Sequence, residues 1–268
     1  MKILALDAST ERCSAALSLA GEQRSLSEIC PRSHSQRLPE MVGQLLDDAG
    51  ITLADLDLLA VGRGPGGFTG VRIGIGYAMG LALASGKPII GVSSLAALAR
   101  QAWLQGRRGA LFTALDARMG EIYLGCWRLD DHGCHEQQPP LVAAPAQLAA
   151  LAVAGPALLV GSAGPVHGHS LQQLAQPLTI DEALLLPEAS AMLALAEQAW
   201  RAGDSGQLAA LEPLYLRNNV VSVGAARVCP PRPPASSDPM RFPKAAPHAS
   251  PPGHSSCHNP RGHPSSAR

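Results

Sequence analysis

The stretch Ala60-Val-Gly-Arg-Gly-Pro-Gly-Gly-Phe-Thr-Gly-Val-Arg-Ile-Gly-Ile-Gly-Tyr-Ala-Met-Gly-Leu-Ala-Leu-Ala84 decides how this chain folds. It predicts the end of a strand, a glycine-rich turn and an apolar helix that begins near Thr69, whose hydroxyl can cap the free amides of the first helical turn. Glycine inside a helix costs about 1 kcal/mol relative to alanine, yet small residues recur here at i, i+4 spacing. Because small side chains let another backbone approach closely, we expect the helix to pack against neighbours on more than one side. The small residues form two adjacent faces, Gly70, Gly74, Ala78 and Ala82 on one and Gly76, Gly80 and Ala84 on the other.

The glycine-rich turn resembles two kinds of phosphate-binding loop. Gly62, Gly64 and Gly67 match G-x-G-x-x-G, the fingerprint of dinucleotide sites. Such a site also needs an acidic residue about 20 positions further on, and no Asp or Glu lies between Asp57 and Asp116. A Walker-type loop is excluded as well, because no Gly-Lys-Ser/Thr follows. Two interpretations stay open: a tight structural turn, or backbone amides at a helix N-terminus that contact an anion or a partner.

Composition predicts a globular chain with an aliphatic core. The 268 residues are 46% hydrophobic but only 3% aromatic, and they suffice for one large or two modest domains. Formal net charge is zero, but six of the 21 basic and one of the 21 acidic residues fall in 222–268, which leaves 15 basic and 20 acidic residues in 1–221. This mildly acidic part argues against strong nucleic-acid binding by the chain alone.

The sequence also indicates a compartment. Its six cysteines show no CxxC or disulfide-framework spacing, and its first apolar residues reach an acid at Asp7, so we expect no signal peptide. The longest uncharged apolar run, 73–84, is too short to span a bilayer. We therefore expect a cytoplasmic protein with reduced thiols and no membrane association.

Hydrophobic periodicity predicts the order βββαβαβα for the first hundred residues, and hence a mixed sheet covered by helices. The predicted strands are Lys2–Asp7, Cys13–Leu19, Arg24–Ile29, Leu58–Val61 and Pro88–Val92, and the helices are His34–Ala49, Thr69–Ala84 and Ser94–Leu104.

A second unit begins after Arg107-Arg108-Gly109. Ala110–Asp116 and Glu121–Leu129 predict strands, and Ala5-Leu-Asp-Ala8 of the first hairpin recurs as Ala114-Leu-Asp-Ala117. This repeat predicts two duplicated lobes, residues 1–106 and 107–221. Further helices are predicted at Ala146–Ala152 and Ala189–Ala202, and Pro213–Arg217 is predicted as a closing strand or clamp.

Composition changes abruptly at Ser222. Eleven of the 23 prolines fall in 222–268, a segment too poor in apolar residues to offset its ordering entropy, so we predict disorder there. Its spacing of His254, Cys257, His258 and His263 fits no closed metal site. The sudden change favours the hypothesis of an out-of-frame or read-through ending.

The first hairpin offers weak candidates for cofactor binding in Asp7, Ser9 and Thr10. With Asp116 in the matching hairpin, they could hold a nucleotide between two lobes. However, close phosphate approach favours glycine where Ala8 and Ser9 stand, and an Asx or ST turn explains these residues equally well. We therefore predict no cofactor.

Recognised catalytic patterns are missing from the sequence. There is no HExxH pair and no GxSxG elbow, and His167-x-His169 is predicted to lie solvated in a glycine-rich loop. We predict no catalytic residues and no metal ligands, which favours an interaction subunit.

Several segments together resemble the TsaB family, the bacterial dimerisation subunits of the machinery that makes N6-threonylcarbamoyladenosine in tRNA. The resemblance runs from residue 1 to about 220 and implies an α/β fold of the actin/Hsp70-like (ASKHA, RNase H-like) type, with two duplicated lobes and mixed sheets. The segments that carry it are Ile3–Thr10, Ser33–Pro39, Gly62–Gly74, Gly91–Leu95, Asp116–Tyr123 and Pro213–Arg217.

The resemblance also implies a noncatalytic role. In the catalytic paralogue, TsaD, a histidine motif binds a metal just after the strand that matches Ile89–Val92, whereas Ser93–Leu98 here contains no histidine. The family implies pairing with a TsaD-type paralogue through the first two helices, a TsaE-type ATPase as a further partner, and tRNA bound only through the complex. Without its partner, the chain is expected to form a homodimer. The predicted partner interface is Leu38, Met41, Val42, Leu45, Gly70, Ile73, Gly74 and Tyr77.

Two other classes of function remain alternatives. One is an enzyme of the same superfold, metallopeptidase-like or a small-molecule kinase, since fold does not fix function. Missing metal histidines oppose the peptidase, and the glycine-poor Asp7 loop opposes the kinase. The other is a homodimeric binding module unrelated to tRNA.

Overall fold

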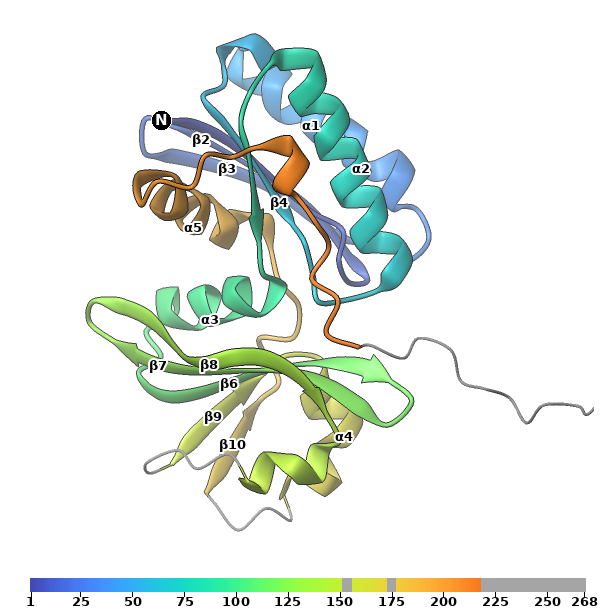
Figure 1. The fold of residues 1–268 in the computed structure, drawn as a ribbon, viewed down its shortest axis with the longest axis vertical. Coiled ribbons are helices and arrows are strands. Elements are labelled where there is room, and N and C mark those ends of the chain that lie inside the picture. Colours follow the sequence, from blue (N-terminus) through green and yellow to red (C-terminus); the bar gives the residue numbers. More distant parts are fainter. Residues whose placement is uncertain (151–155, 173–176, 218–268) are drawn as a thin grey trace, which may run out of the picture. The chain divides into compact units, whose positions relative to one another are not determined.

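Two five-stranded sheets carry the fold in the computed structural model, which describes residues 1–150, 156–172 and 177–217 (Figure 1). The first sheet has the order β3-β2-β1-β4-β5. Its centre is β1, which pairs antiparallel with β2 and parallel with β4. The strands are β1 Lys2–Asp7, β2 Arg12–Leu19, β3 Glu22–Ile29, β4 Leu58–Gly62 and β5 Ile89–Val92.

The second sheet repeats this topology. Its order β8-β7-β6-β9-β10 places β6 at the centre, antiparallel to β7 and parallel to β9. Asp7 ends β1 and Asp116 lies near the end of β6, so the recurring Ala-Leu-Asp-Ala motif marks equivalent hairpins. The strands are β6 Gly109–Arg118, β7 Glu121–Asp130, β8 Gly133–Ala143, β9 Ala157–Val160 and β10 Leu178–Asp181.

Helices cover both faces of each sheet (Figure 1). On the first sheet, α1 (His34–Ala49) and α2 (Phe68–Ser85) pack on one face and α5 (Ala189–Arg201) on the other. On the second sheet, α3 (Ser94–Leu104) packs on one face and α4 (Ala163–Gln172) on the other. The short helices η1 Leu53–Asp55, η2 Pro145–Ala150 and η3 Leu208–Ala210 complete the described elements.

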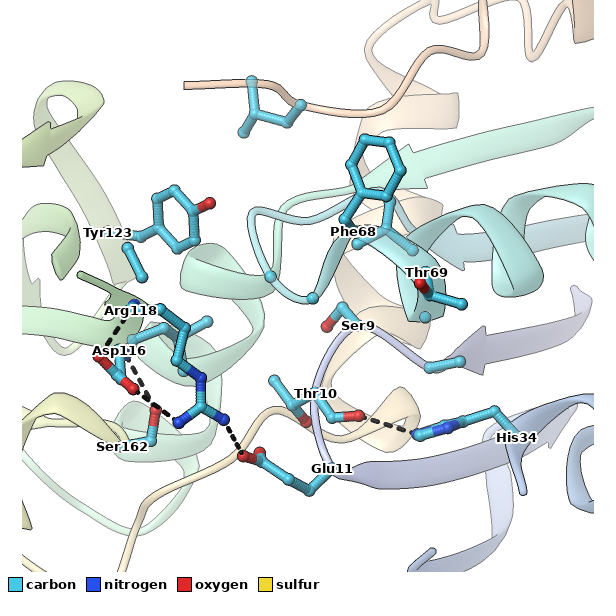
Figure 2. Close-up of a pocket in the computed structure, with 18 of the residues that line it drawn as sticks. Ser9, Thr10, Glu11, His34, Phe68, Thr69, Asp116, Arg118, Tyr123 and Ser162 are labelled. Carbon is cyan, nitrogen blue, oxygen red and sulfur yellow. Dashed lines mark hydrogen bonds and ion pairs between the residues drawn. The ribbon is translucent and has the colours of Figure 1, made fainter. Parts of the chain in front are cut away.

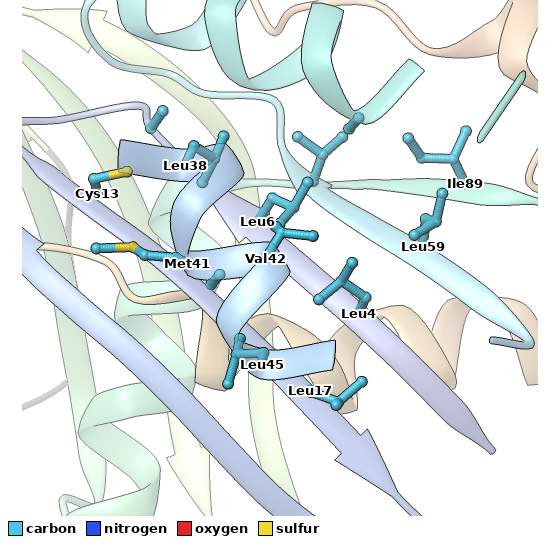
Figure 3. Packing of buried hydrophobic residues seen from close by; sticks show 14 of the residues in the cluster. Leu4, Leu6, Cys13, Leu17, Leu38, Met41, Val42, Leu45, Leu59 and Ile89 are labelled. Atoms are coloured by element: carbon cyan, nitrogen blue, oxygen red, sulfur yellow. The ribbon is translucent and has the colours of Figure 1, made fainter. Parts of the chain in front are cut away.

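The apolar stripe of α1 fills the core of the first lobe. Leu38, Met41, Val42 and Leu45 are at most 4% exposed and pack on Leu4, Leu6, Leu17 and Leu59 of the sheet (Figure 3). These four α1 residues belong to the predicted partner interface, but in the structure they are buried against the chain's own sheet. A helix lying on a sheet must turn its apolar stripe toward the sheet, so the same periodicity that suggests a docking face here builds the core.

Helix α2 begins one residue earlier than predicted and without the predicted cap. Gly67 is the N-cap and no side chain caps it, so Thr69 lies inside the first turn. By length and composition alone α2 could cross a membrane. In this fold one face of α2 is buried against the first lobe, and its buried residues are Val71, Gly74, Ile75, Ala78 and Ala82.

The end of the described chain returns to the first sheet. We call residues 206–217 the C-terminal strap. The Gly206 carbonyl accepts from Ile89 N at 2.9 Å, and Leu214 N donates to the Arg63 carbonyl at 2.8 Å. The strap has no strand, so of the two forms predicted for Pro213–Arg217 it is a clamp.

Helix α5 and the strap lie in the stretch predicted as a second lobe, 107–221, although both pack on the first sheet. The division at residues 106 and 107 stays a prediction. The predicted tail 222–268 and its histidines lie outside the described residues.

Candidate functional site

A pocket of about 730 Å³ opens between the two matching hairpins and the start of α2 (Figure 2). The β1–β2 hairpin forms one wall, the β6–β7 hairpin and Ser162 the other, and the strap closes one side. Five of the six segments that resemble the TsaB family contribute to its lining, and the sixth contributes Ser94, which donates to Ser9 of the wall. The pocket is therefore where the family-like segments meet.

Asp7 lies behind the first wall rather than in the pocket. Its carboxylate accepts from Ser9 N at 3.3 Å and from Ser9 Oγ at 3.1 Å, and Ser9 Oγ in turn accepts from Ser94 Oγ at 2.9 Å. Asp7 is fully buried, and burial raises its pKa to about 7. Of the three weak cofactor candidates, the structure brings Ser9 and Thr10 to the pocket and leaves Asp7 out.

Thr10 is also engaged within the chain. Its hydroxyl accepts from Arg12 N at 3.3 Å, and its carbonyl accepts from His34 Nε2 at 2.8 Å, as the dashed line in Figure 2 marks. The hairpin is thus held in shape by its own hydrogen bonds, as the turn interpretation of these residues predicts.

The glycine-rich turn fits tightly against the first hairpin. A Cβ on Gly66 would lie 2.1 Å from the Ser9 carbonyl oxygen, and a Cβ on Gly70 would lie 2.1 Å from that of Ala8. Gly67 N donates to the Ser9 carbonyl at 2.7 Å. These glycines are needed for backbone contact within the chain, which favours the structural interpretation of the turn.

This contact corrects a second part of the predicted partner interface. Gly70 and Gly74 face Ala8, since a Cβ on Gly74 would lie 3.6 Å from Ala8 Cβ, so that small-residue face packs internally. Ile73 and Tyr77 flank it and are half-buried.

The second wall gathers charged groups around Asp116. Its carboxylate contacts Arg118 Nη1 at 3.2 Å and His167 Nε2 at 3.3 Å, and its amide donates to Ser162 Oγ at 3.1 Å. Arg118 also reaches across the pocket to Glu11 at 3.4 Å (Figure 2). The predicted loop around His167 is wrong: this residue lies in α4, and its side chain is only 14% exposed because it packs beside Asp116.

Aromatic and cationic groups stand at the pocket mouth. The rings of Phe68 and Tyr215 are 6.3 Å apart, and the Arg72 guanidinium lies 3.2 Å from the first ring centre and 5.2 Å from the second. Arg217 of the strap pairs with Glu121 and contacts the carbonyls of Ala117 and Arg118.

Sequence periodicity does not identify these groups, because neither an exposed arginine nor a single aromatic residue has a periodic signal. The pairing of Asp116 with the first hairpin and the family-like segments Gly62–Gly74, Asp116–Tyr123 and Pro213–Arg217 indicate this region, but not the roles of these side chains. Within the described residues, no three His, Cys, Asp or Glu side chains stand close enough together to hold a metal.

Comparison with known proteins gives consistent matches. The family model described as TsaD, tRNA N6-adenosine threonylcarbamoyltransferase, matches residues 26–225. A tRNA threonylcarbamoyladenosine biosynthesis protein TsaB from Escherichia coli is 41% identical over 223 residues, which cover 82% of this chain and 96% of that protein. A protein of the same name from Haemophilus influenzae is 34% identical over 228 residues, covering 82% and 95%.

A solved structure extends the match to the fold. YeaZ from Pseudomonas aeruginosa has a TM-score of 0.74 and 40% sequence identity, covering 80% of this chain and 99% of that chain. The two-lobe, actin-like α/β architecture expected from the sequence is confirmed.

Proposed function

This chain belongs to the TsaB family, and we propose that it acts in tRNA N6-threonylcarbamoyladenosine synthesis as a noncatalytic subunit, one that dimerises with a TsaD-type catalytic paralogue and stabilises it. Its relatives are named for that biosynthesis. A TsaD family model also fits 26–225, which supports a partner built on the same fold.

One observation supports a partner helix surface. Gly76, Gly80, Leu83 and Ala84, which we call the α2 strip, face outward on one side of α2. Leu83 is 71% exposed, and a Cβ placed on either glycine meets no atom within 4 Å. Glycine inside a helix lowers helix stability. The open space around Gly76 and Gly80 indicates that packing within the chain does not require glycine at these positions. Close approach by another protein's backbone is a physical reason for both residues.

The pocket supports a noncatalytic role in a different way. Asp7, the acid of the first hairpin, is buried outside the pocket, and the hydroxyls of Ser9 and Thr10 are engaged in hydrogen bonds within the chain. This arrangement opposes the small-molecule kinase alternative. The metallopeptidase alternative requires a cluster of metal ligands, and the described residues contain no group of three His, Cys, Asp or Glu side chains that could form one.

Other parts of the proposal follow from family membership. We expect a TsaE-type ATPase to join the pair, tRNA to bind only through the complex, and the chain to work in the cytoplasm. Without its partner, the α2 strip would pair with that of a second copy, because an apolar face of this kind seldom stays in water.

Co-purification tests the interface. We expect the wild-type chain to elute with the TsaD-type paralogue in size-exclusion chromatography, and Gly80→Leu to elute alone. The substitution adds bulk where the chain leaves open space, so the variant should fold as the wild type does. Leu104→Ala, at a residue that is 58% exposed on α3, is the matched control and should retain the complex.

Nucleoside analysis tests the role. Depletion of the chain should lower threonylcarbamoyladenosine in tRNA, and Gly80→Leu should not restore it. An unchanged nucleoside content after depletion would overturn the function, whereas unaltered complex formation by Gly80→Leu would overturn only the interface.

A further inference from the structure

Exposed apolar side chains gather around the pocket mouth. Among the described residues, eight large hydrophobic side chains are exposed, and four of them lie here. Phe68, Val166 and Tyr215 line the pocket, and Met119 contacts Arg217 through its sulfur at 3.6 Å. Such a cluster on one side of a protein marks an interaction site more often than chance exposure.

Two of these side chains present rings that a flat ligand could stack on. Phe68 is 56% exposed and Tyr215 is 50% exposed, and their planes are inclined by 34°. Arg72 lies over both rings, which adds a planar cation to the same surface. Aromatic rings and guanidinium groups together are the surface on which proteins stack unpaired bases.

The pocket lining is more basic than the protein around it. It contains Arg32, Arg118 and Arg217 against Glu11 and Asp116, although residues 1–221 as a whole carry an excess of acid. Arg118 is 76% exposed, so it can turn from Glu11 toward a ligand. Arg217 is held by Glu121 and by two carbonyls, so the guanidinium groups that the lining offers an anion are those of the exposed Arg32 and Arg118.

The pocket is also continuous with the surface proposed for the partner. Ile73 lines the pocket and lies on α2, one turn before Gly76 of the α2 strip. A molecule held by the partner beside this strip can reach the pocket without leaving the interface. Stacking rings, an excess of arginine and this position together favour an extended polyanion with an unstacked base over a free small molecule.

We propose that this pocket binds an unpaired nucleotide of the tRNA that the complex modifies, with the base against Phe68 and Tyr215 and the phosphate near Arg32 and Arg118. The inference rests on the proposed function, since it takes the tRNA as the substrate of the complex. The chain then contributes directly to substrate binding. Because residues 1–221 as a whole carry an excess of acid, we expect this binding only in the complex.

The test measures tRNA affinity of the full-length chain in complex with its TsaD-type paralogue, by filter binding at one fixed salt concentration. Phe68→Ser and Tyr215→Ser each remove one stacking surface at an exposed position, and each should raise the Kd about tenfold. Leu104→Ser removes an equally exposed apolar side chain from α3 and should leave the Kd unchanged. Arg32→Ala should lower the slope of log K against log salt by roughly one phosphate contact.

A second measurement locates the contact. After ultraviolet cross-linking of tRNA that carries 4-thiouridine, we expect linked peptides from 68–72 or 213–217. Unchanged affinity in both serine variants, together with cross-links elsewhere, would overturn the inference while the complex and its function stand.

Two other outcomes would also overturn it. If the serine variants lose the ATPase subunit but keep tRNA affinity, the surface binds protein. If the wild-type chain forms no complex with the paralogue, the proposed function fails as well. That failure is visible in the wild-type chain alone, so it is distinguishable from a failure of the serine variants.

Discussion

The buried carboxyl of Asp7 makes the stability of the protein depend on pH. Folding moves its pKa from an ordinary value of 3.8 to about 7, chiefly because burial disfavours the charged form, while the hydrogen bonds from Ser9 oppose the shift. The folded state therefore binds this proton more tightly than the unfolded state does. Stability from this group is fully present below about pH 4 and is lost as the pH rises to about 7.

The size of the effect follows from the shift. Each pKa unit corresponds to about 1.4 kcal/mol, so a shift of about 3 units makes a difference of about 4 kcal/mol between acid and neutral conditions. Asp7→Asn keeps the shape and an acceptor for Ser9 N but cannot ionise. We expect the variant to exceed the wild type in free energy of unfolding by about 1–2 kcal/mol at pH 5 and about 4 kcal/mol at pH 8.

Urea unfolding of both proteins at the two pH values is the assay, because taking the difference between them cancels every other titration that they share. Ser14→Ala is the matched control. Ser14 lies opposite Asp7 in the sheet register and is 1% exposed, and its hydroxyl, which accepts from Ala189 N, does not titrate in this range. Its difference from the wild type should be the same at both pH values. A difference between Asp7→Asn and the wild type that does not grow from pH 5 to pH 8 would refute the reasoning.

Four further substitutions separate internal packing from surface. Gly70→Ala should destabilise the protein by about 1–3 kcal/mol, because its Cβ would lie 2.1 Å from the Ala8 carbonyl oxygen, while Gly76→Ala on the same helix should stabilise it by about 1 kcal/mol; equal unfolding midpoints for the two variants would contradict this. Leu38→Ala should lower the free energy of unfolding by about 2–5 kcal/mol, because the side chain is fully buried on the sheet. Denaturant unfolding measures this, and a loss near zero would show that the side chain is not in the core. Gly62→Ala should be more damaging than either alanine variant of α2, because its Cβ would lie 1.9 Å from Asp7 Oδ1, and thermal unfolding would show it.

The sequence predicts most of the first lobe because its elements are long and periodic. Helix His34–Ala49 has the predicted bounds, and Gly50 ends it with a φ of 62°. The second lobe is harder to predict. Strand β8 contains Pro139 and Pro140 at the sheet edge, β9 and β10 have only four residues each, and α4 contains glycine and proline, so local propensity opposes each assignment.

The site shows a different limit. Helical spacing identifies which residues share a face, but it does not say whether that face meets the chain's own sheet or another protein. Leu38 of α1 and Gly74 of α2 are buried against the first lobe, whereas Gly76 and Gly80, on the adjacent face of α2, are exposed. For α2 the difference depends on how the helix is rotated over the sheet, and the close contacts of Gly70 and Gly74 with Ala8, far away in the sequence, fix that rotation.

The return of α5 to the first sheet has a consequence for synthesis on the ribosome. The sheet is complete once β5 has been made, but its second face, with Ile3, Ala5 and Leu58, is covered mainly by α5, with Ala97 of α3 in the same cluster. Ala189 N donates to Ser14 Oγ at 2.9 Å, so β2 also receives a hydrogen bond from the helix that closes the lobe. The N-terminal lobe therefore cannot mature as the nascent chain emerges, and nearly the whole described chain must leave the exit tunnel first. A fragment that ends at residue 188 lacks α5, so we expect it to leave this apolar face exposed and to be less soluble than the full chain.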